Sequence, residues 1–313
     1  MSELVRAPVR QVRSRIFDSA RWAGYCARPD DIIIATFPKC GTTWTQRIVS
    51  MLLAGSAAPA PVGGPWPDFR LRGDIEPILE QAEAIPGRRH LKSHLPYDAL
   101  PVWEGVKFIH VARDGRDSAM SMHNHLHGFR PEMNAVMDHV SLTDPKFGDA
   151  APRAPENLAE YFRDWLVDGG GMGDQGASFW AVERSYWAAR RDPNMLLVHY
   201  SDLKADLGGE IARIARYLEI DLPARVMDEI TAAACFESMR EQGEALMPGA
   251  IMAWVDGAKT FLNKGVNGRW QGAFDEADLA TYKAKLAEEF TPALAAWLDG
   301  GRLVAGDPAL AAD

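Results

Sequence analysis

The feature that most constrains this chain is a short apolar segment that leads through a glycine-containing loop into a helical pattern. Residues 31–37 (DIIIATF) are mostly β-branched and apolar, as expected of a buried strand. Residues 45–54 place apolar side chains at helical spacing, and Thr42 and Thr43 stand near the expected helix start. A strand, a loop and a helix in this order direct unpaired N–H groups and the helix dipole at one point, where an anion is stabilised.

The loop itself, Pro38–Trp44 (PKCGTTW), has the residue types of a phosphate site. Lys39 brings a positive charge, the two threonines bring hydroxyl donors, and Gly41 lets the backbone approach a ligand closely. It differs from the Walker loop GxxxxGK[ST], because its lysine precedes its glycine. The loop therefore predicts a phosphate-type ligand and disfavours a conventional nucleoside triphosphatase.

Further apolar segments alternate with helical patterns along the chain. Candidate strands lie at 89–92, 106–112 and 195–200, and a helix is expected from about Ser118. This alternation predicts an α/β fold with a central parallel sheet flanked by helices on both faces. Because polar residues follow each strand, and ligands bind at the carboxyl ends of such strands, we expect one shared cleft. No linker or repeat divides residues 1–313, which predicts a single domain.

One long segment departs from the alternation. Residues 129–177 contain four prolines and the run GGGMG at 169–173. A segment of this length with little periodicity is usually a functional lid or a variable insertion, so we expect it to border the substrate cleft. Phe129 and Met133 are candidates for an apolar acceptor pocket.

Composition excludes several classes of function. The net charge of −9 argues against a nucleic-acid partner. No apolar run is long enough to span a membrane. Three scattered cysteines are too few for a disulfide framework, which favours a cytoplasmic location. The sequence makes no prediction about oligomeric state.

The segment TFPKCGTTW resembles the 5'-phosphosulfate loop of the cytosolic-type sulfotransferase family, and four further segments resemble family motifs in the same order. They are KSHLP at 92–96, Arg113 followed by Ser121, YSDLK at 200–204 and FLNKGVNGRW at 261–270. The resemblance covers most of the chain, from about residue 30 to residue 275.

The resemblance implies an enzyme that transfers the sulfuryl group of 3'-phosphoadenosine 5'-phosphosulfate (PAPS) to a hydroxyl of a small or lipid-like acceptor. The product would be 3'-phosphoadenosine 5'-phosphate (PAP), and no metal would be required. It implies His94 as general base, with Lys39 stabilising the leaving phosphate and Lys92 the transferring group. The implied cofactor-binding residues are Lys39, Cys40, Gly41, Thr42, Thr43, Trp44, Arg113, Ser121, Tyr200, Phe236, Lys264 and Gly265. Trp44, Tyr200 and Phe236 among them would supply aromatic faces for adenine.

The chain departs from the family pattern at Asn263, where the family has an arginine that binds the 3'-phosphate. Lys264 or Arg269 is the candidate replacement for this charge. The alternative function is a nucleotide kinase or other phosphotransferase on a similar P-loop fold. That alternative would need a carboxylate to hold Mg²⁺, and Asp114 is the candidate.

A cluster of three histidines, His123, His125 and His127, follows Ser121. On a helix only His123 and His127 would share a face, so a three-histidine metal site is not expected. A face near the acceptor cleft is the favoured interpretation.

Overall fold

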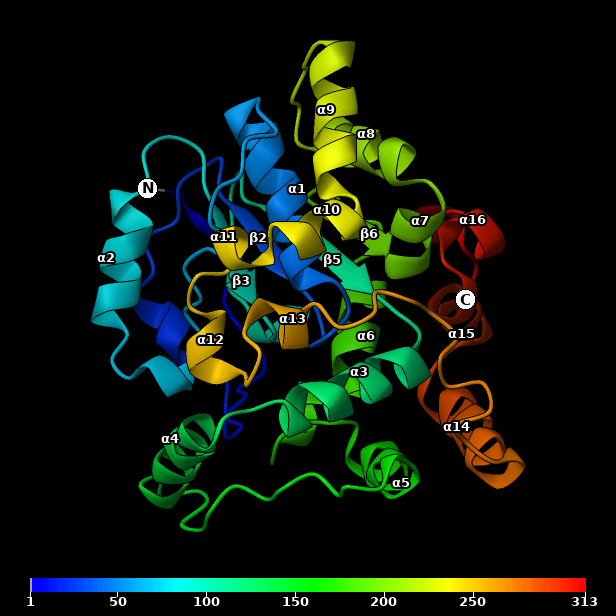
Figure 1. The fold of residues 1–313 in the computed structure, drawn as a ribbon. Coiled ribbons are helices and arrows are strands. Elements are labelled where there is room, and N and C mark those ends of the chain that lie inside the picture. The colour runs from blue at the N-terminus through cyan, green and yellow to red at the C-terminus, as the bar shows by residue number, and fades with distance from the viewer. Residues whose placement is uncertain (1) are drawn as a thin grey trace.

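The computed structural model describes residues 2–313 and is built around a four-stranded parallel sheet (Figure 1). The strands are β2 (Ile32–Ala35), β3 (His90–Ser93), β5 (Lys107–Ala112) and β6 (Met195–His199), paired in the order β3-β2-β5-β6. A separate antiparallel pair is formed by β1 (Leu4–Arg6) and β4 (Val102–Trp103). Because β2 is an interior strand, the loop that follows it opens between the ends of its neighbours.

Sixteen α-helices surround the sheet within the described residues. Their bounds are α1 Thr42–Ala54, α2 Glu76–Ala84, α3 Gly115–His127, α4 Pro131–Leu142, α5 Leu158–Asp168, α6 Phe179–Ala188, α7 Tyr200–Ala205, α8 Leu207–Tyr217, α9 Ala224–Ala234, α10 Phe236–Glu241, α11 Gly243–Leu246, α12 Ala250–Ala253, α13 Ala258–Phe261, α14 Glu276–Glu289, α15 Pro292–Gly300 and α16 Arg302–Ala305. None of the helices in residues 2–313 is both long and apolar enough to cross a membrane.

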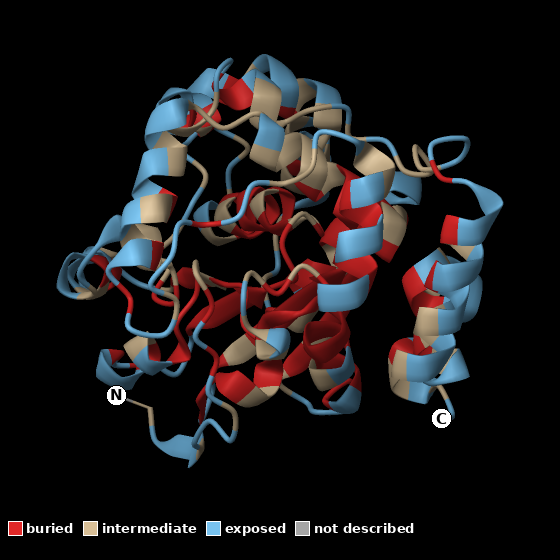
Figure 2. Cartoon of the chain, turned by 90° about the horizontal axis from the view of Figure 1, so that it is seen from below, coloured by how far each residue is buried: buried red, intermediate tan, exposed pale blue. Residues whose placement is uncertain are grey.

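The alternation of side chains along β2 divides the interior into two apolar cores. Ile32 and Ile34 belong to the core that includes residues of α1, α8 and α9, whereas Ile33 and Ala35 belong to the core that includes α6 and α15. Figure 2 shows the sheet as almost entirely buried, with exposed residues on the outer faces of the helices. The predicted α/β fold, with helices on both faces of a parallel sheet, is confirmed.

The segment 129–177 contains two regular helices, α4 and α5, although its sequence shows little periodicity. Pro131 stands at the start of α4, where a helix needs no N–H donor, and therefore begins the helix rather than ending one. Asn157 Oδ1 accepts hydrogen bonds from the N–H groups of Ala159 and Glu160 and caps α5.

Candidate active site

The phosphate-type loop connects β2 to α1 and turns sharply at two residues. Lys39 has a φ of 69° and Gly41 a φ of 119°. A Cβ atom at Gly41 would lie 3.2 Å from the Tyr200 ring, so glycine meets both a conformational and a steric requirement. Gly41 caps α1 without a side-chain hydrogen bond, which leaves the first N–H groups of the helix available to an anion.

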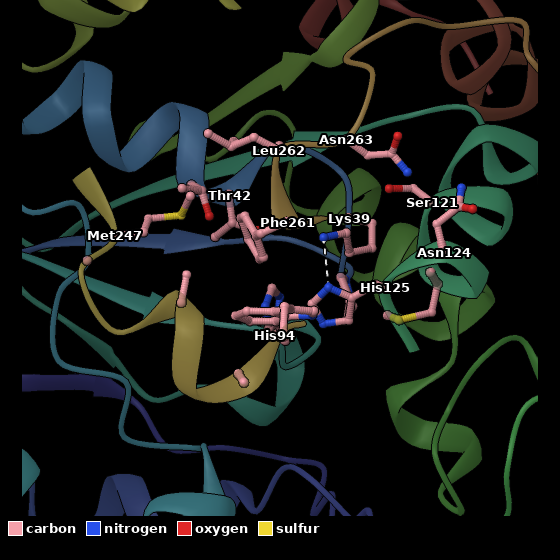
Figure 3. A pocket seen from close by; sticks show the side chains of 18 of the residues that line it. Lys39, Thr42, His94, Ser121, Asn124, His125, Met247, Phe261, Leu262 and Asn263 are labelled. Carbon is pink, nitrogen blue, oxygen red and sulfur yellow. Dashed lines mark hydrogen bonds between the residues drawn. The ribbon is translucent and has the colours of Figure 1, made fainter. Parts of the chain in front are cut away.

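This loop opens into a cavity of about 940 Å³ (Figure 3). All predicted site residues but one line the cavity: Lys39, Gly41, Thr42, Thr43, Trp44, Lys92, His94, Arg113, Ser121, Tyr200, Phe236, Lys264 and Gly265. The exception is Cys40, whose Sγ lies in the core, 3.7 Å from Ser118 Oγ. Burial raises the pKa of the Cys40 thiol well above its ordinary value, so this side chain packs against α3 as a small neutral group.

His94 follows β3 and is oriented by its first ring nitrogen. Its Nδ1 lies 2.7 Å from the Thr36 carbonyl oxygen, so Nδ1 carries the proton and donates it. Nε2 is consequently unprotonated and has no hydrogen-bond partner among residues 2–313. Burial and the positive charge of Lys92 lower the pKa of His94 well below its ordinary value. The imidazole is therefore neutral at pH 7 and able to accept a proton.

Asp68 is fully buried and organises the wall around His94. Its carboxylate accepts hydrogen bonds from Trp22 Nε1 at 3.1 Å, Trp66 Nε1 at 3.0 Å and the backbone N–H of His94 at 3.1 Å. The Trp66 ring is thereby held edge-on to the imidazole, with ring centres 5.0 Å apart. Burial raises the pKa of Asp68. The sequence indicated neither Asp68 nor Trp66 as a site residue.

Both predicted catalytic lysines face aromatic rings in the cavity. Lys92 Nζ lies 3.5 Å from the centre of the Trp66 ring, and Lys39 Nζ lies 4.1 Å from that of Phe261. Burial lowers the pKa of each lysine to about 7, and the charges of Lys92 and Arg113 add to the effect at Lys39. An anionic ligand would shift both lysines back toward their charged forms.

Arg113 follows β5 and connects two of the motifs that the sequence singled out. Its guanidinium donates to the Lys39 carbonyl oxygen at 3.2 Å and to Asn267 Oδ1 at 3.0 Å. It also lies over the Tyr200 ring, 4.1 Å from the ring centre. Arg113 thus binds both the loop after β2 and the segment 261–270. Ser121, on α3, lines the same cavity.

The Asp114 carboxylate, which a kinase would need as its magnesium ligand, forms hydrogen bonds with Arg116 instead. Its Oδ1 accepts from the backbone N–H and from Nε of Arg116, at 2.8 Å and 3.0 Å. This cap starts α3 at Gly115 rather than near Ser118, where the sequence placed it. Within residues 2–313, no cluster of three or more His, Cys, Asp or Glu side chains is arranged to hold a metal.

The three aromatic residues predicted for adenine all line the cavity. Trp44 and Tyr200 pack edge-on with ring centres 5.3 Å apart, and Trp44 Nε1 donates to the Ala234 carbonyl at 2.7 Å. A Cβ atom at Gly265, which has a φ of 61°, would come within 2.4 Å of the Phe236 ring. Glycine is therefore required where the segment 261–270 crosses Phe236.

The rest of the cavity is apolar and rich in methionine. Eight of the 12 methionines of the chain line it: Met120, Met122, Met133, Met137, Met172, Met239, Met247 and Met252. Unbranched thioether side chains adapt well to irregular apolar ligands. The segment 129–177 contributes Phe129, Met133 and Met172 to this wall, where the sequence predicted the substrate cleft.

The sequence predicted a face near the acceptor cleft for the three histidines, and among them only His125 lines the cavity. Nε2 of His123 and Nε2 of His127 both lie near the Pro155 carbonyl oxygen, at 3.0 Å and 2.9 Å. His125 projects from another face of α3 into the cavity, and its Nδ1 lies 3.1 Å from Lys39 Nζ (Figure 3). The helical spacing that separates His125 from the other two histidines was the one available signal.

A phosphate loop, a neutral histidine and several cations around one cavity define an α/β group-transfer enzyme. Residues 29–291 match the family described as the sulfotransferase domain. The chain is 31% identical to a glycolipid sulfotransferase of Mycobacterium bovis (strain BCG / Pasteur 1173P2), over 93% of this chain and 94% of that relative.

Two solved structures share the fold. Mouse sulfotransferase SULT7A1 complexed with PAP gives a TM-score of 0.66 at 21% identity, covering 88% of this chain and 89% of that one. Retinol dehydratase in a complex with retinol and PAP gives 0.65 at 22% identity, covering 87% and 86%. The chain belongs to the sulfotransferase domain family, and the predicted sulfotransferase activity class is confirmed.

Proposed function

We propose that this sulfotransferase moves the sulfuryl group of PAPS to a hydroxyl of a lipid-like acceptor. The observation that carries the proposal is a single cavity in which a phosphate loop and a neutral histidine meet a methionine-rich apolar wall. The similarity to a glycolipid sulfotransferase, and to a structure that holds retinol with PAP, supports an apolar acceptor that carries a hydroxyl.

The residues of the cavity fit PAPS, which supplies the activated sulfuryl group. The first N–H groups of α1, together with Thr42, Thr43 and Lys39, would hold the phosphosulfate. Arg113 and Ser121 would hold the 3'-phosphate. Trp44, Tyr200 and Phe236 would enclose the adenine.

Arg269 is the better candidate for the cation that Asn263 does not supply. Arg269 is half-buried and lines the cavity, whereas Lys264 also lines it but is exposed. The guanidinium of Arg269 has no hydrogen-bond or ion-pair partner within residues 2–313. We therefore assign Arg269 to the 3'-phosphate, together with Arg113.

His94 would act as the general base. Its unprotonated Nε2 takes the proton of the acceptor hydroxyl while the acceptor oxygen forms a bond to sulfur. The bond from sulfur to the bridging oxygen breaks, and the electron pair stays on the phosphate of PAP. Lys39 would stabilise the charge on that oxygen and Lys92 the charge on the transferring group.

The proposal is tested by incubating the purified protein with ³⁵S-labelled PAPS and matched acceptors. We expect labelled product with glycolipids and long-chain alcohols, and less with a small phenol. Calorimetry should show binding of PAP in the absence of Mg²⁺. Absence of transfer to every acceptor, or binding of ATP–Mg²⁺ without binding of PAP, would overturn it.

We also propose a cytoplasmic location. The three cysteines form no disulfide with one another, which suits a reducing compartment. Cell fractionation with an antibody against the chain tests this, and recovery of the protein in a secreted fraction would contradict it.

A further inference from the structure

His125 lies where the phosphate loop meets the apolar wall, and aromatic rings enclose its imidazole. The ring centres of Phe129, Trp254 and Phe261 lie 5.0, 4.9 and 5.7 Å from that of His125. Phe261 is also the ring over which the Lys39 ammonium lies. These contacts hold the imidazole with Nδ1 toward Lys39 (Figure 3).

The contact with Lys39 determines which nitrogen of His125 carries a proton. In its ammonium form, which an anionic ligand favours, Lys39 only donates, so His125 Nδ1 accepts at 3.1 Å and the proton resides on Nε2. His94 has the opposite tautomer, since its Nδ1 donates to Thr36. The cavity therefore presents an N–H donor on one histidine and an unprotonated nitrogen on the other. A hydroxyl group, which both accepts and donates, complements this pair.

His125 is also the one hydrogen-bond partner of the Lys39 ammonium within residues 2–313. A lysine side chain has four flexible bonds, and fixing it at the moment of transfer costs conformational entropy. A partner that holds the ammonium beforehand lowers that cost in the transition state. The imidazole is placed to do so, because it is itself fixed by three rings.

We propose that His125 is a positioning residue for sulfuryl transfer. Its Nδ1 holds Lys39 at the boundary between the phosphate loop and the acceptor wall, and its Nε2–H orients the acceptor hydroxyl toward His94. This role rests on the proposed sulfotransferase reaction and adds to it a residue on the acceptor side of the cavity.

Two substitutions separate the two functions of the imidazole. His125→Phe keeps a ring among Phe129, Trp254 and Phe261 but removes both nitrogens. We expect kcat to fall about tenfold or more and the acceptor KM to rise about tenfold, because each function is one hydrogen bond, one of them to a charged group. The Kd of PAP, measured by calorimetry, should change less than about threefold, since the bound nucleotide keeps its other contacts.

His125→Asn places an amide oxygen near the position of Nδ1 but does not reach the position of Nε2. We expect kcat to return to within about threefold of the native value, while the acceptor KM stays raised about tenfold. A role confined to packing would not give this split between kcat and KM. Should the Phe variant not fold, the Asn variant decides by itself through a near-native kcat with a raised acceptor KM.

His123→Phe is the matched control, because His123 lies on the same helix but contacts the Pro155 carbonyl. Its kcat and KM should equal those of the native enzyme. If the native enzyme transfers sulfate and His125→Phe is equally active, or if His125→Asn does not restore kcat, the role of His125 is overturned alone. If the native enzyme transfers no sulfate from PAPS, the proposed function itself is overturned.

Discussion

The two ends of the cavity are built by different means. The cofactor end has at its centre a loop of residues adjacent in sequence, Lys39–Trp44, of which all but Cys40 line the cavity. The acceptor end is made by side chains from segments far apart, among them Phe17, residues 129–137, Met172 and residues 247–254. Changes at the first end should therefore alter chemistry or nucleotide affinity, whereas changes at the second should alter the choice of acceptor.

The largest loss of activity is expected from a substitution of His94, which lies where the two ends meet. In His94→Asn the amide N–H can still donate to the Thr36 carbonyl, but no base replaces Nε2. We expect kcat to fall by about 10²- to 10⁴-fold, because a positioned base contributes that much, with the Kd of PAP unchanged. Labelled-sulfate turnover and calorimetry measure the two quantities.

His139→Asn is the control for this variant, since His139 is exposed on α4 and makes no side-chain hydrogen bond within residues 2–313. It should retain native kcat. A His94→Asn enzyme within about threefold of native kcat would show that the base lies elsewhere.

The next effect is confined to the cofactor end and depends on pH. Lys39 and Lys92 each have a pKa of about 7 in the free site, and an anion raises it by favouring the ammonium form. Affinity for PAP should therefore fall as pH rises through 7, by about fivefold from pH 7 to pH 8 for each lysine that takes up a proton on binding. Calorimetry at the two pH values tests this.

Lys39→Met should remove the contribution of Lys39 to the pH dependence of PAP affinity. Lys283→Met, at an exposed position on α14, should leave this pH dependence unchanged. The stability of the fold should change with pH in the direction opposite to the PAP affinity. Because the folded-state pKa of Lys39 lies below its unfolded value of 10.5, the unfolded chain binds more protons between those values and stability rises with pH. An affinity for PAP that is independent of pH would contradict the linkage.

The contrast between the two ends also explains what the sequence could predict. The fold and the phosphate loop followed from local patterns, because a strand, a loop and a helix that are contiguous in sequence are contiguous in space. The resemblance to the sulfotransferase family implied the other cofactor residues. Asp68 escaped prediction because it meets the His94 backbone from 26 residues away, out of a stretch that shows no periodicity. Trp254 and Phe129 meet only through tertiary packing around His125, which no local spacing encodes.

A third effect is confined to the acceptor end, where kcat/KM should increase stepwise with the length of the acceptor. For straight-chain alcohols of increasing length, kcat/KM should rise about fourfold per added CH₂ until the cavity is full, because each buried CH₂ contributes about 0.8 kcal/mol. Met133→Asp should flatten this dependence, whereas the volume-conserving Met133→Leu should keep it. Initial rates at saturating PAPS measure the slope. If kcat/KM of the native enzyme did not change with the length of the alcohol, the alkyl chain of the acceptor would not bind among the methionines.

The smallest effect is expected at the edge of the cofactor end, from Asn263→Arg. A guanidinium at this half-exposed position should tighten PAP binding by about two- to fivefold, since such a pair contributes roughly 0.5–1 kcal/mol. If Arg269 already binds the 3'-phosphate, Arg269→Ala should weaken PAP binding. Asn263→Arg should then increase the affinity for PAP by a larger factor in the Arg269→Ala variant than in the native enzyme. The double-mutant cycle, measured by calorimetry with PAP, isolates this coupling. Equal gains in both backgrounds would mean that the two positions act independently and that Arg269 does not take the place of the missing arginine.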